Sequence, residues 1–212
     1  MKAYTPHEIM SLAPVIPVLT IEKLADAEPL ARALVAGGLK VLEITLRTDA
    51  ALEAIGRIAQ AIPEAVVGAG TLTTEDDFDR VVRAGAEFAI SPGAPPDLLA
   101  AGRGASIPFL PGVATATELM TAVAQGYDHL KFFPAEVAGG IPALKALAGP
   151  FADVRFCPTG GIGADNAQDY LRLPNVMCVG GSWVAPKDAV LNGDWGRITA
   201  LAAEARTTVK AA

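Results

Sequence analysis

Residues 40–70, KVLEITLRTDAALEAIGRIAQAIPEAVVGAG, contain the pattern that decides the fold. Lys40–Leu46 and Ala65–Gly70 are short runs rich in apolar and β-branched residues, which are typical of buried strands. Between them, Asp49–Ile62 repeats its apolar residues at helical spacing. The stretch therefore predicts one strand–helix–strand unit whose two strands are parallel.

The same unit recurs along the chain. Eight strands alternating with helices predict a parallel α/β fold, and eight units in 212 residues favour a (β/α)8 TIM barrel over the alternative, a doubly wound open sheet. No linker or composition break divides the chain, so we expect residues 1–212 to form a single domain, with an extra N-terminal helix over Thr5–Ala13 covering the barrel bottom. The predicted strands are Val15–Thr20, Lys40–Leu46, Ala65–Gly70, Phe88–Ser91, Ile107–Gly112, His129–Pro134, Val154–Pro158 and Val176–Gly180, and the clearest helical segments are Leu24–Ala36, Asp49–Ile62, Glu75–Ala84 and Thr115–Gln125. Asp49, Thr74 and Thr115 are the expected N-caps.

Composition excludes several classes of protein. A net charge of −6 and the lack of any Lys/Arg run argue against nucleic-acid binding. No apolar stretch reaches the roughly 18 residues of a membrane helix, and the N-terminus lacks a signal-peptide pattern, so we expect a cytoplasmic protein with no membrane partner. Cys157 and Cys178 lie in apolar runs and are interpreted as small buried side chains. With His7 and His129 as the only histidines, we expect no metal site and no cofactor.

Lys131 stands in the strand-like stretch LKFFPAE, residues 130–136. A water-poor, apolar site disfavours the ammonium form of lysine and frees the nitrogen lone pair for nucleophilic attack. Taken alone, the stretch is better explained by a lysine on an exposed strand face or reaching the rim. The polar residues elsewhere in the chain favour the reactive amine.

Glu43 lies in the predicted second strand. Alternation puts Glu43, Thr45 and, if the strand continues, Arg47 on one face, and the opposite face is rich in leucine and isoleucine. The leucine-rich face suits the outer helices, so the polar face is expected to line the barrel interior. A structural Glu43–Arg47 ion pair remains open; functionally, Glu43 is a candidate acid/base and Arg47 a fork for a carboxylate.

Small residues mark the ends of the other strands. Thr71 follows Gly68-Ala69-Gly70 and offers a hydroxyl at the strand mouth, or an N-cap, and Pro92 is interpreted as a rigid pocket wall. Gly160-Gly161 follows the seventh strand and Gly180-Gly181-Ser182 ends the eighth, where barrels usually bind phosphate. Backbone amides without Cβ atoms can point at a phosphate, so these two turns are interpreted as phosphate loops, although two ordinary tight turns are the alternative.

Five stretches together resemble the family of 2-keto-3-deoxy-6-phosphogluconate (KDPG) and 4-hydroxy-2-oxoglutarate aldolases. The similarity runs in order from about Val15 to about Arg197, and residues 94–106 and the C-terminal tail are less distinctive. The stretches that carry it are residues 42–48 (LEITLRT), 68–71 (GAGT), 131–136 (KFFPAE), 155–162 (RFCPTGGI) and 180–183 (GGSW).

The resemblance implies a class I aldolase of the Entner–Doudoroff pathway, a carbon–carbon lyase that forms a Schiff base and is usually a homotrimer. The implied reaction splits 2-dehydro-3-deoxy-6-phosphogluconate into pyruvate and glyceraldehyde 3-phosphate, and 4-hydroxy-2-oxoglutarate into pyruvate and glyoxylate. The implied roles are the Schiff-base lysine for Lys131, acid/base catalysis for Glu43, carboxylate binding for Arg47 and Thr71, substrate recognition for Thr159, phosphate binding for Gly160, Gly161, Gly181 and Ser182, and pocket shape for Pro92 and Phe133.

Three other functions stay open at this point. An aldolase of the same family could act on the 6-phosphogalactonate epimer, which differs at C4. A metal-free sugar-phosphate isomerase, epimerase or decarboxylase would usually pair the lysine with nearby aspartates, but His129 occupies the position two residues before Lys131. A non-catalytic binding barrel would bind ligand without forming an imine.

Overall fold

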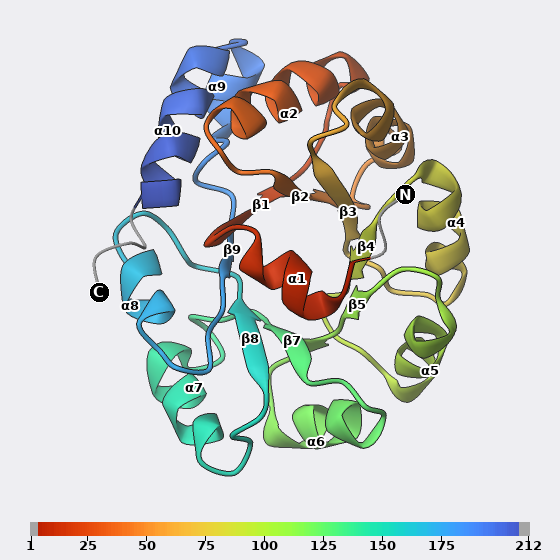
Figure 1. Cartoon of the computed structure of the whole chain (residues 1–212), viewed down its shortest axis with the longest axis vertical. Coiled ribbons are helices and arrows are strands. Elements are labelled where there is room, and N and C mark those ends of the chain that lie inside the picture. The colour runs from red at the N-terminus through yellow and green to blue at the C-terminus, as the bar shows by residue number, and fades with distance from the viewer. Residues whose placement is uncertain (1–3, 208–212) are drawn as a thin grey trace.

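Strand–helix alternation runs through residues 4–207, the part of the chain that the computed structural model describes. The strands surround the centre of the molecule, the helices lie outside them, and α1 lies over the central space (Figure 1). The strands are β1 (Val15–Leu19), β2 (Val41–Thr45), β3 (Val66–Gly70), β4 (Phe88–Ile90), β5 (Phe109–Leu110), β6 (Gly112–Val113), β7 (His129–Phe132), β8 (Arg155–Pro158) and β9 (Val179–Gly181). The helices are α1 (Pro6–Ser11), the 3-10 helix η1 (Leu24–Asp26), α2 (Ala27–Ala36), α3 (Ala51–Ala61), α4 (Asp76–Ala84), α5 (Pro96–Gly104), α6 (Ala116–Ala124), α7 (Gly140–Ala148), α8 (Ala167–Leu171), α9 (Lys187–Leu191) and α10 (Trp195–Thr207).

The strands form curled parallel sheets, as the alternation predicted. Six strands pair in the order β5-β4-β3-β2-β1-β9, and three pair as β6-β7-β8. The predicted fifth strand is interrupted at Pro111, which has no N–H to donate and therefore separates β5 from β6. Between β8 and β9, parallel pairing is reduced to the single bridges Phe156↔Val176 and Thr159↔Gly180. The chain therefore has an α/β fold with two curled parallel sheets, which are joined between β8 and β9 by isolated bridges.

Only one of the three expected N-caps is present. Thr115 caps α6 through a reciprocal capping box with Glu118, in which each side chain bonds the other residue's backbone N–H. The N-caps expected at Asp49 and Thr74 are not observed. Helices α3 and α4 begin one or two residues later than expected, and the side chain at the observed N-cap of each does not bond the helix.

Two apolar cores pack on the two faces of the sheets. The larger fills the space between the sheets and the outer helices and includes Leu42 and Ile44 of β2. The smaller lies inside the ring of strands. Its members are Ile9, Met10, Ile16, Val41, Val66, Phe88, Ile90, Leu110, Cys157 and Cys178. Both cysteines are free and buried, as predicted.

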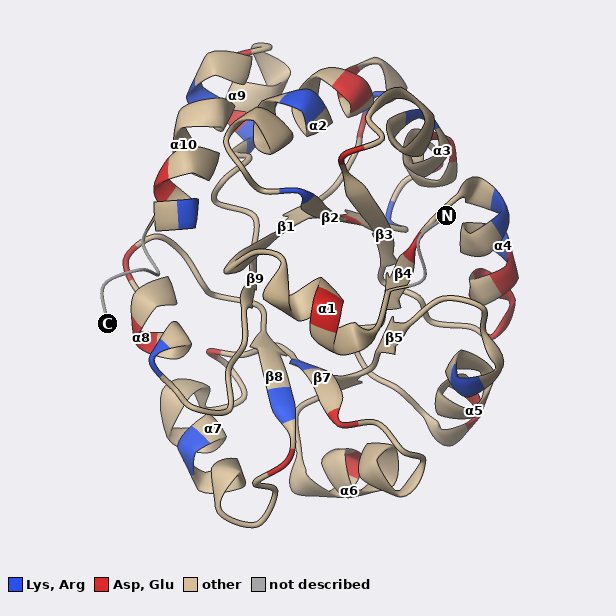
Figure 2. Cartoon of the chain, viewed as in Figure 1, with Lys and Arg blue, Asp and Glu red and all other residues tan. Residues whose placement is uncertain are grey.

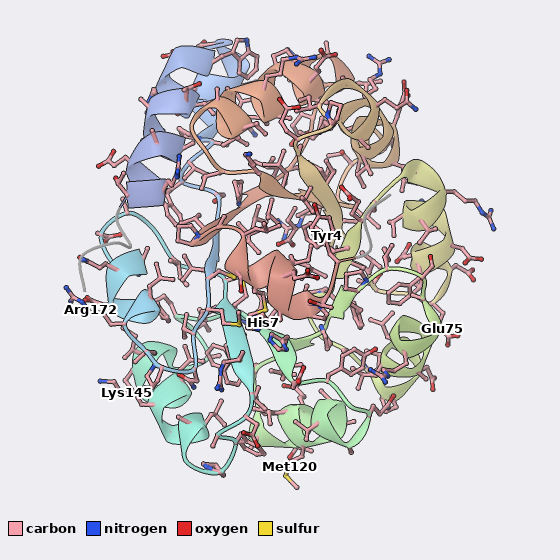
Figure 3. All side chains as sticks on the ribbon, in the orientation of Figure 1. Tyr4, His7, Glu75, Met120, Lys145 and Arg172 are labelled. Atoms are coloured by element: carbon pink, nitrogen blue, oxygen red, sulfur yellow. The ribbon has the colours of Figure 1, made fainter. Side chains whose placement is uncertain are left out.

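Helix α1 is the expected extra N-terminal helix and lies at the end of the ring where the chain enters β1. Thr5 begins it with a capping box to Glu8. His7 of α1 lies over the centre of the view (Figure 3), and its Nδ1 is 3.2 Å from Nε2 of His129 on β7. Nδ1 of His129 is in turn 2.7 Å from Oδ1 of Asp128. Apolar burial and this polar contact together hold α1 against the strands.

Charged residues of both signs lie along the outer helices in this view (Figure 2). Helix α4 alone carries Asp76, Asp77, Asp79, Arg80 and Arg83. Within residues 4–207, no helix combines the length and the apolar character needed to cross a bilayer.

The loop between β3 and α4 is fixed by one buried carboxylate. Oδ2 of Asp77 accepts hydrogen bonds from the backbone N–H groups of Thr73 (3.0 Å) and Thr74 (3.1 Å), and Oδ1 accepts from Arg80 at 2.9 Å. Burial alone would raise the pKa of Asp77, but the hydrogen bonds from Thr73 and Thr74 and the charge of Arg80 together lower it. The ionised side chain therefore stabilises the folded loop.

We expect Asp77→Asn to destabilise the protein by about 1–2 kcal/mol near neutral pH, because the amide replaces a charged acceptor of two backbone N–H groups. The folded-state pKa lies below the unfolded value of about 3.9, so the contribution is complete above that value and is lost as the pH falls through the folded-state pKa. Urea unfolding of both proteins between about pH 7 and pH 2 should show the difference shrinking with acid. Asp79→Asn, at an exposed position on the same helix, is the control and should change stability by less than about 0.5 kcal/mol. Equal losses in both variants would contradict the assignment.

Candidate active site

Buried polar residues gather inside the ring of strands, above the smaller apolar core. On β2, Val41 belongs to that core, and the next inward-facing residues toward the C-terminal end of the strand are Glu43 and Thr45. The carboxyl ends of parallel strands meet at one edge, which is where α/β barrels gather their functional groups. The buried polar residues of this layer are Glu43, Thr45, Ser91, Lys131 and Thr159.

Lys131 and Glu43 form a buried ion pair across the ring. Lys131 lies on β7, where its register partners are Gly112 and Cys157, and Glu43 lies opposite on β2. Nζ of Lys131 donates to Oε1 of Glu43 at 3.0 Å, and the two side chains are only 6% and 2% exposed. A proton can pass directly between two groups at this distance.

Aromatic and proline residues surround the lysine. Nζ of Lys131 lies 5.4 Å from the ring centre of Phe133. Gly112, beside Lys131, lies against the backbone of Pro92, to which a Cβ on Gly112 would approach within 2.4 Å. Phe133 therefore lies near the amine, and Pro92 lies against the strand next to Lys131.

Glu43 occupies space that exists because residue 70 has no side chain. A Cβ built on Gly70 would lie 2.1 Å from Oε1 of Glu43 and 2.6 Å from its Cγ. Gly70 is the register partner of Thr45 on the adjacent strand, so the carboxylate of Glu43 lies over the β3 backbone. Glycine at position 70 therefore leaves the space that the Glu43 side chain fills.

Arg47 lies beyond the end of β2, so the condition under which alternation would place it on the face of Glu43, a continued strand, is not met. Strand β2 ends at Thr45, and the N–H of Arg47 turns back to donate to the carbonyl of Thr45 at 2.8 Å. Arg47 is exposed, and the ion-pair partner of Glu43 is Lys131. The alternative interpretation, a buried Glu43–Arg47 ion pair, was therefore wrong.

Arg47 and Thr71 nevertheless line one open cavity of about 470 Å³ beyond the ends of β2 and β3. Thr71 has a φ of +66°, the left-handed region that a β-branched residue rarely adopts. Such a conformation persists only where the surroundings impose it, and it is most common at functional sites. A guanidinium and a hydroxyl beside one cavity can hold a carboxylate.

The two predicted phosphate loops lie side by side. Residues 159–163, called here the glycine loop, follow β8, and Thr159 forms a parallel bridge with Gly180 of β9. Gly160 and Gly161 have φ of +101° and +78°. Among the described residues, the backbone N–H groups of Gly161 and Ser182 donate no hydrogen bond. Free amides in such a glycine turn form a concave site for an anion.

Thr159 and Gly181 are held by close packing within this region. Thr159 is 6% exposed, and its Oγ1 donates to the carbonyl of Cys157 at 3.4 Å. A Cβ on Gly180 would lie 2.2 Å from Oγ1 of Thr159, and one on Gly181 would overlap the ring of Trp183. The fold thus requires glycine at both positions.

The buried Cys178 thiol below the ion pair is a poor nucleophile. A hydrogen bond with Cys157, complete burial and the negative charge of Glu43 raise the pKa of the Cys178 thiol. Lys131 offers a primary amine in this interior, and its position next to a carboxylate suits imine formation with a carbonyl compound.

Sequence reasoning missed two residues that contact the glycine loop and a third that holds one of them. Asn166 bonds the loop backbone, Glu136 packs beneath Gly161, and the hydroxyl of Tyr170 donates to Glu136. Glu136 and Tyr170 are 34 positions apart, so no local pattern relates them. Only the short spacing from Gly161 to Asn166 offered a signal, because Asn often bonds nearby backbone in turns.

Comparison with known proteins gives one consistent result. The family model for KDPG and KHG aldolase matches residues 7–201. The 2-dehydro-3-deoxy-phosphogluconate aldolase of Dickeya dadantii is 55% identical over 199 residues, which are 94% of this chain and 93% of that protein. The KHG/KDPG aldolase of Escherichia coli strain K12 is 53% identical with the same coverage.

Solved structures agree. The crystal structure of a KDPG aldolase from Legionella pneumophila, with pyruvate captured at low pH as a covalent carbinolamine intermediate, has a TM-score of 0.94 and 51% identity, and the match covers 95% of this chain and 98% of that one. A native KDPGal structure is more distant, with a TM-score of 0.80 and 26% identity over 92% of this chain and 93% of that one.

We expect Gly70→Ala to destabilise the protein by about 1–3 kcal/mol, because the new methyl group forces the Glu43 carboxylate away from Lys131. Denaturant unfolding measures the change. Gly104→Ala is the control, because a Cβ at that position would meet nothing within 4 Å, and its effect should stay within about 0.5 kcal/mol. A Gly70→Ala variant as stable as Gly104→Ala would show that Glu43 does not need the space over residue 70.

Proposed function

Because the chain belongs to the KDPG and KHG aldolase family, we propose that it is a class I aldolase that cleaves 2-dehydro-3-deoxy-6-phosphogluconate into pyruvate and glyceraldehyde 3-phosphate. The observation that carries the proposal is the buried contact of 3.0 Å between Lys131 Nζ and Glu43 Oε1. A primary amine of this kind is what a pyruvate carbinolamine requires, and the Legionella relative was captured in that form.

The reaction begins with the amine of Lys131. Glu43 accepts a proton from Nζ, and the neutral amine adds to the C2 carbonyl of the substrate to give a carbinolamine. Glu43 returns a proton to the C2 hydroxyl, which leaves as water, and a protonated imine remains. The imine accepts the electron pair of the breaking C3–C4 bond far better than the ketone would.

Cleavage and release use the same carboxylate. Glu43 takes the proton of the C4 hydroxyl as the C3–C4 bond breaks, so that C4 becomes the aldehyde of glyceraldehyde 3-phosphate and C3 becomes part of an enamine. A proton returned to C3 converts the enamine to the pyruvate imine, and water hydrolyses this to pyruvate and the free lysine. In the steps from amine addition to enamine protonation, Glu43 accepts or returns one proton at a time.

The two ends of the substrate are anions and need separate sites. Arg47 and Thr71 hold the carboxylate next to C2 from their shared cavity. Gly160, Gly161, Gly181 and Ser182 bind the phosphate with backbone and hydroxyl donors, and Thr159 lies between the two ends. Pro92 and Phe133 form the wall near the amine. Fixing both ends holds the C3–C4 bond perpendicular to the imine plane, and this orientation contributes to the rate of cleavage.

A second substrate, 4-hydroxy-2-oxoglutarate, is cleaved to pyruvate and glyoxylate. The Escherichia coli relative is named for both activities, and the chemistry at Lys131 is the same for both compounds. The 6-phosphogalactonate epimer is not favoured as the main substrate, because the native KDPGal structure is far more distant than the phosphogluconate aldolases. The isomerase, decarboxylase and non-catalytic alternatives lack support from the family to which the chain belongs.

The proposal also covers the closure of the fold, the domain organisation and the oligomeric state. The two curled sheets and the bridges between β8 and β9 support closure into a (β/α)8 barrel, and the larger core, which extends from Ala13 to Ala205, supports a single domain over residues 1–212. The family resemblance supports a homotrimer in the cytoplasm, with no nucleic-acid or membrane partner. Sedimentation equilibrium would determine the number of subunits.

We expect borohydride reduction in the presence of pyruvate to attach the reduced adduct to Lys131, located by peptide mass mapping. Lys131→Ala should lose the adduct and at least about 10³-fold of the cleavage rate, because the covalent route is gone. Lys145→Ala is the control: Lys145 is an exposed residue of α7 at the edge of the molecule (Figure 3), and its removal should leave both unchanged. An adduct on another lysine, or none on folded protein, would overturn the proposal.

Glu43→Gln should lower kcat by roughly 10²- to 10⁴-fold, because the amide cannot accept and return protons. Borohydride trapping of pyruvate should persist, although more slowly, since the amine of Lys131 is still present. Single-turnover kinetics and trapping on the same preparation make the comparison. If trapping and cleavage fall by the same factor, Glu43 serves imine formation alone and the later proton transfers belong to another group.

A further inference from the structure

We propose that Glu136 and Tyr170 are positioning residues that hold the glycine loop in its phosphate-binding conformation. This inference rests on the proposed function, and it adds to it by naming a pair that contacts the loop from beneath.

The glycine loop is tied down through its carbonyl groups. The carbonyls of Thr159 and Gly160 accept from the backbone N–H groups of Ala135 (2.7 Å) and Glu136 (3.1 Å). The carbonyl of Gly161 accepts from Nδ2 of Asn166 at 3.0 Å. With the carbonyls bonded to the protein, the N–H of Gly161 is left for a ligand. The orientation of this amide therefore depends on what holds the other side of the loop.

Glu136 fills the space directly beneath Gly161. A Cβ on Gly161 would lie 2.5 Å from Cγ of Glu136 and 2.7 Å from its Cβ, so the two residues are in close contact. Glu136 is nonetheless an exposed residue, and an exposed glutamate ordinarily samples several side-chain conformations. An additional interaction is needed to keep its side chain under the loop.

Tyr170 supplies that interaction. Its ring is completely buried on α8, and its hydroxyl donates to Oε1 of Glu136. Burial, the hydrogen bond and the charge of Glu136 raise the pKa of Tyr170, so the hydroxyl stays protonated and remains a donor at neutral pH. Gly140 leaves room for this contact, because a Cβ there would lie 3.1 Å from the Tyr170 hydroxyl.

The pair thus links three elements that contribute to the site. Glu136 belongs to the segment that follows β7, the strand of Lys131, and Tyr170 belongs to α8, which follows the glycine loop. The buried tyrosine therefore holds the carboxylate end of Glu136, while the Cβ and Cγ of the same side chain lie against Gly161. Loss of the hydroxyl should loosen phosphate binding and leave the chemistry at Lys131 intact.

The test is Tyr170→Phe, which removes one oxygen and keeps the buried ring. We expect the KM for 2-dehydro-3-deoxy-6-phosphogluconate to rise about 3- to 10-fold, as for loss of one hydrogen bond, with kcat within about twofold of wild type. Inhibition by inorganic phosphate should weaken by a similar factor. Borohydride trapping of pyruvate, which has no phosphate, should be unchanged.

Two comparisons separate positioning from general damage. Tyr127→Phe is the matched control, because the Tyr127 hydroxyl is also buried and donates to the carbonyl of Leu99 at 2.7 Å, but it belongs to no part of the site described above. Glu136→Gln keeps an oxygen that can accept from Tyr170 and should stay close to wild type, whereas Glu136→Ala should resemble Tyr170→Phe.

The outcomes are distinct. The inference is overturned if folded Tyr170→Phe keeps the wild-type KM, if Tyr127→Phe raises KM equally, or if pyruvate trapping falls together with phosphate affinity. Wild-type protein that traps no pyruvate would instead overturn the proposed function.

Discussion

The buried contact between Lys131 and Glu43 is the constraint around which the rest of the site is built. Moving two charged groups out of water costs several kcal/mol each, and their mutual attraction often fails to offset that cost. Such a pair therefore contributes little net stability, and its retention needs another reason. The proposed aldolase reaction gives a chemical reason, because in it the amine passes protons to a neighbouring base.

Small residues leave space around the Lys131–Glu43 pair. Gly70 leaves the space that the Glu43 carboxylate fills, and Gly112 lets the backbone of Pro92 approach the strand next to Lys131. Below the pair, the smaller apolar core and α1 fill the ring with hydrocarbon and two thiols. A buried polar layer thus lies over a buried apolar layer, and the amine of Lys131 stands between them in a water-poor environment.

The proposed anion sites of this acidic protein use few positively charged side chains. With a net charge of −6, the chain presents backbone amides in the glycine loop and the guanidinium groups of Arg47 and Arg80 beside a separate cavity. Glu136 contacts the glycine loop from beneath through its Cβ and Cγ, and its carboxylate end bonds Tyr170. The strength of such a site depends on how firmly the amides are held, which gives the buried Tyr170 its importance.

The sequence by itself determined the elements and which residues face inward. A period of two placed Glu43 inside the ring, and the recurring strand–helix units predicted the parallel sheets, because both depend on local patterns of burial. The tertiary structure alone decided where strands end and which residues meet. Strand β2 does not continue to Arg47, because a turn at Thr45 ends it. The fifth strand is divided because the missing N–H of Pro111 interrupts it. The meeting of Lys131 with Glu43, of Glu43 with Gly70 and of Tyr170 with Glu136 depends on contacts between distant segments, for which a single sequence has no local signature.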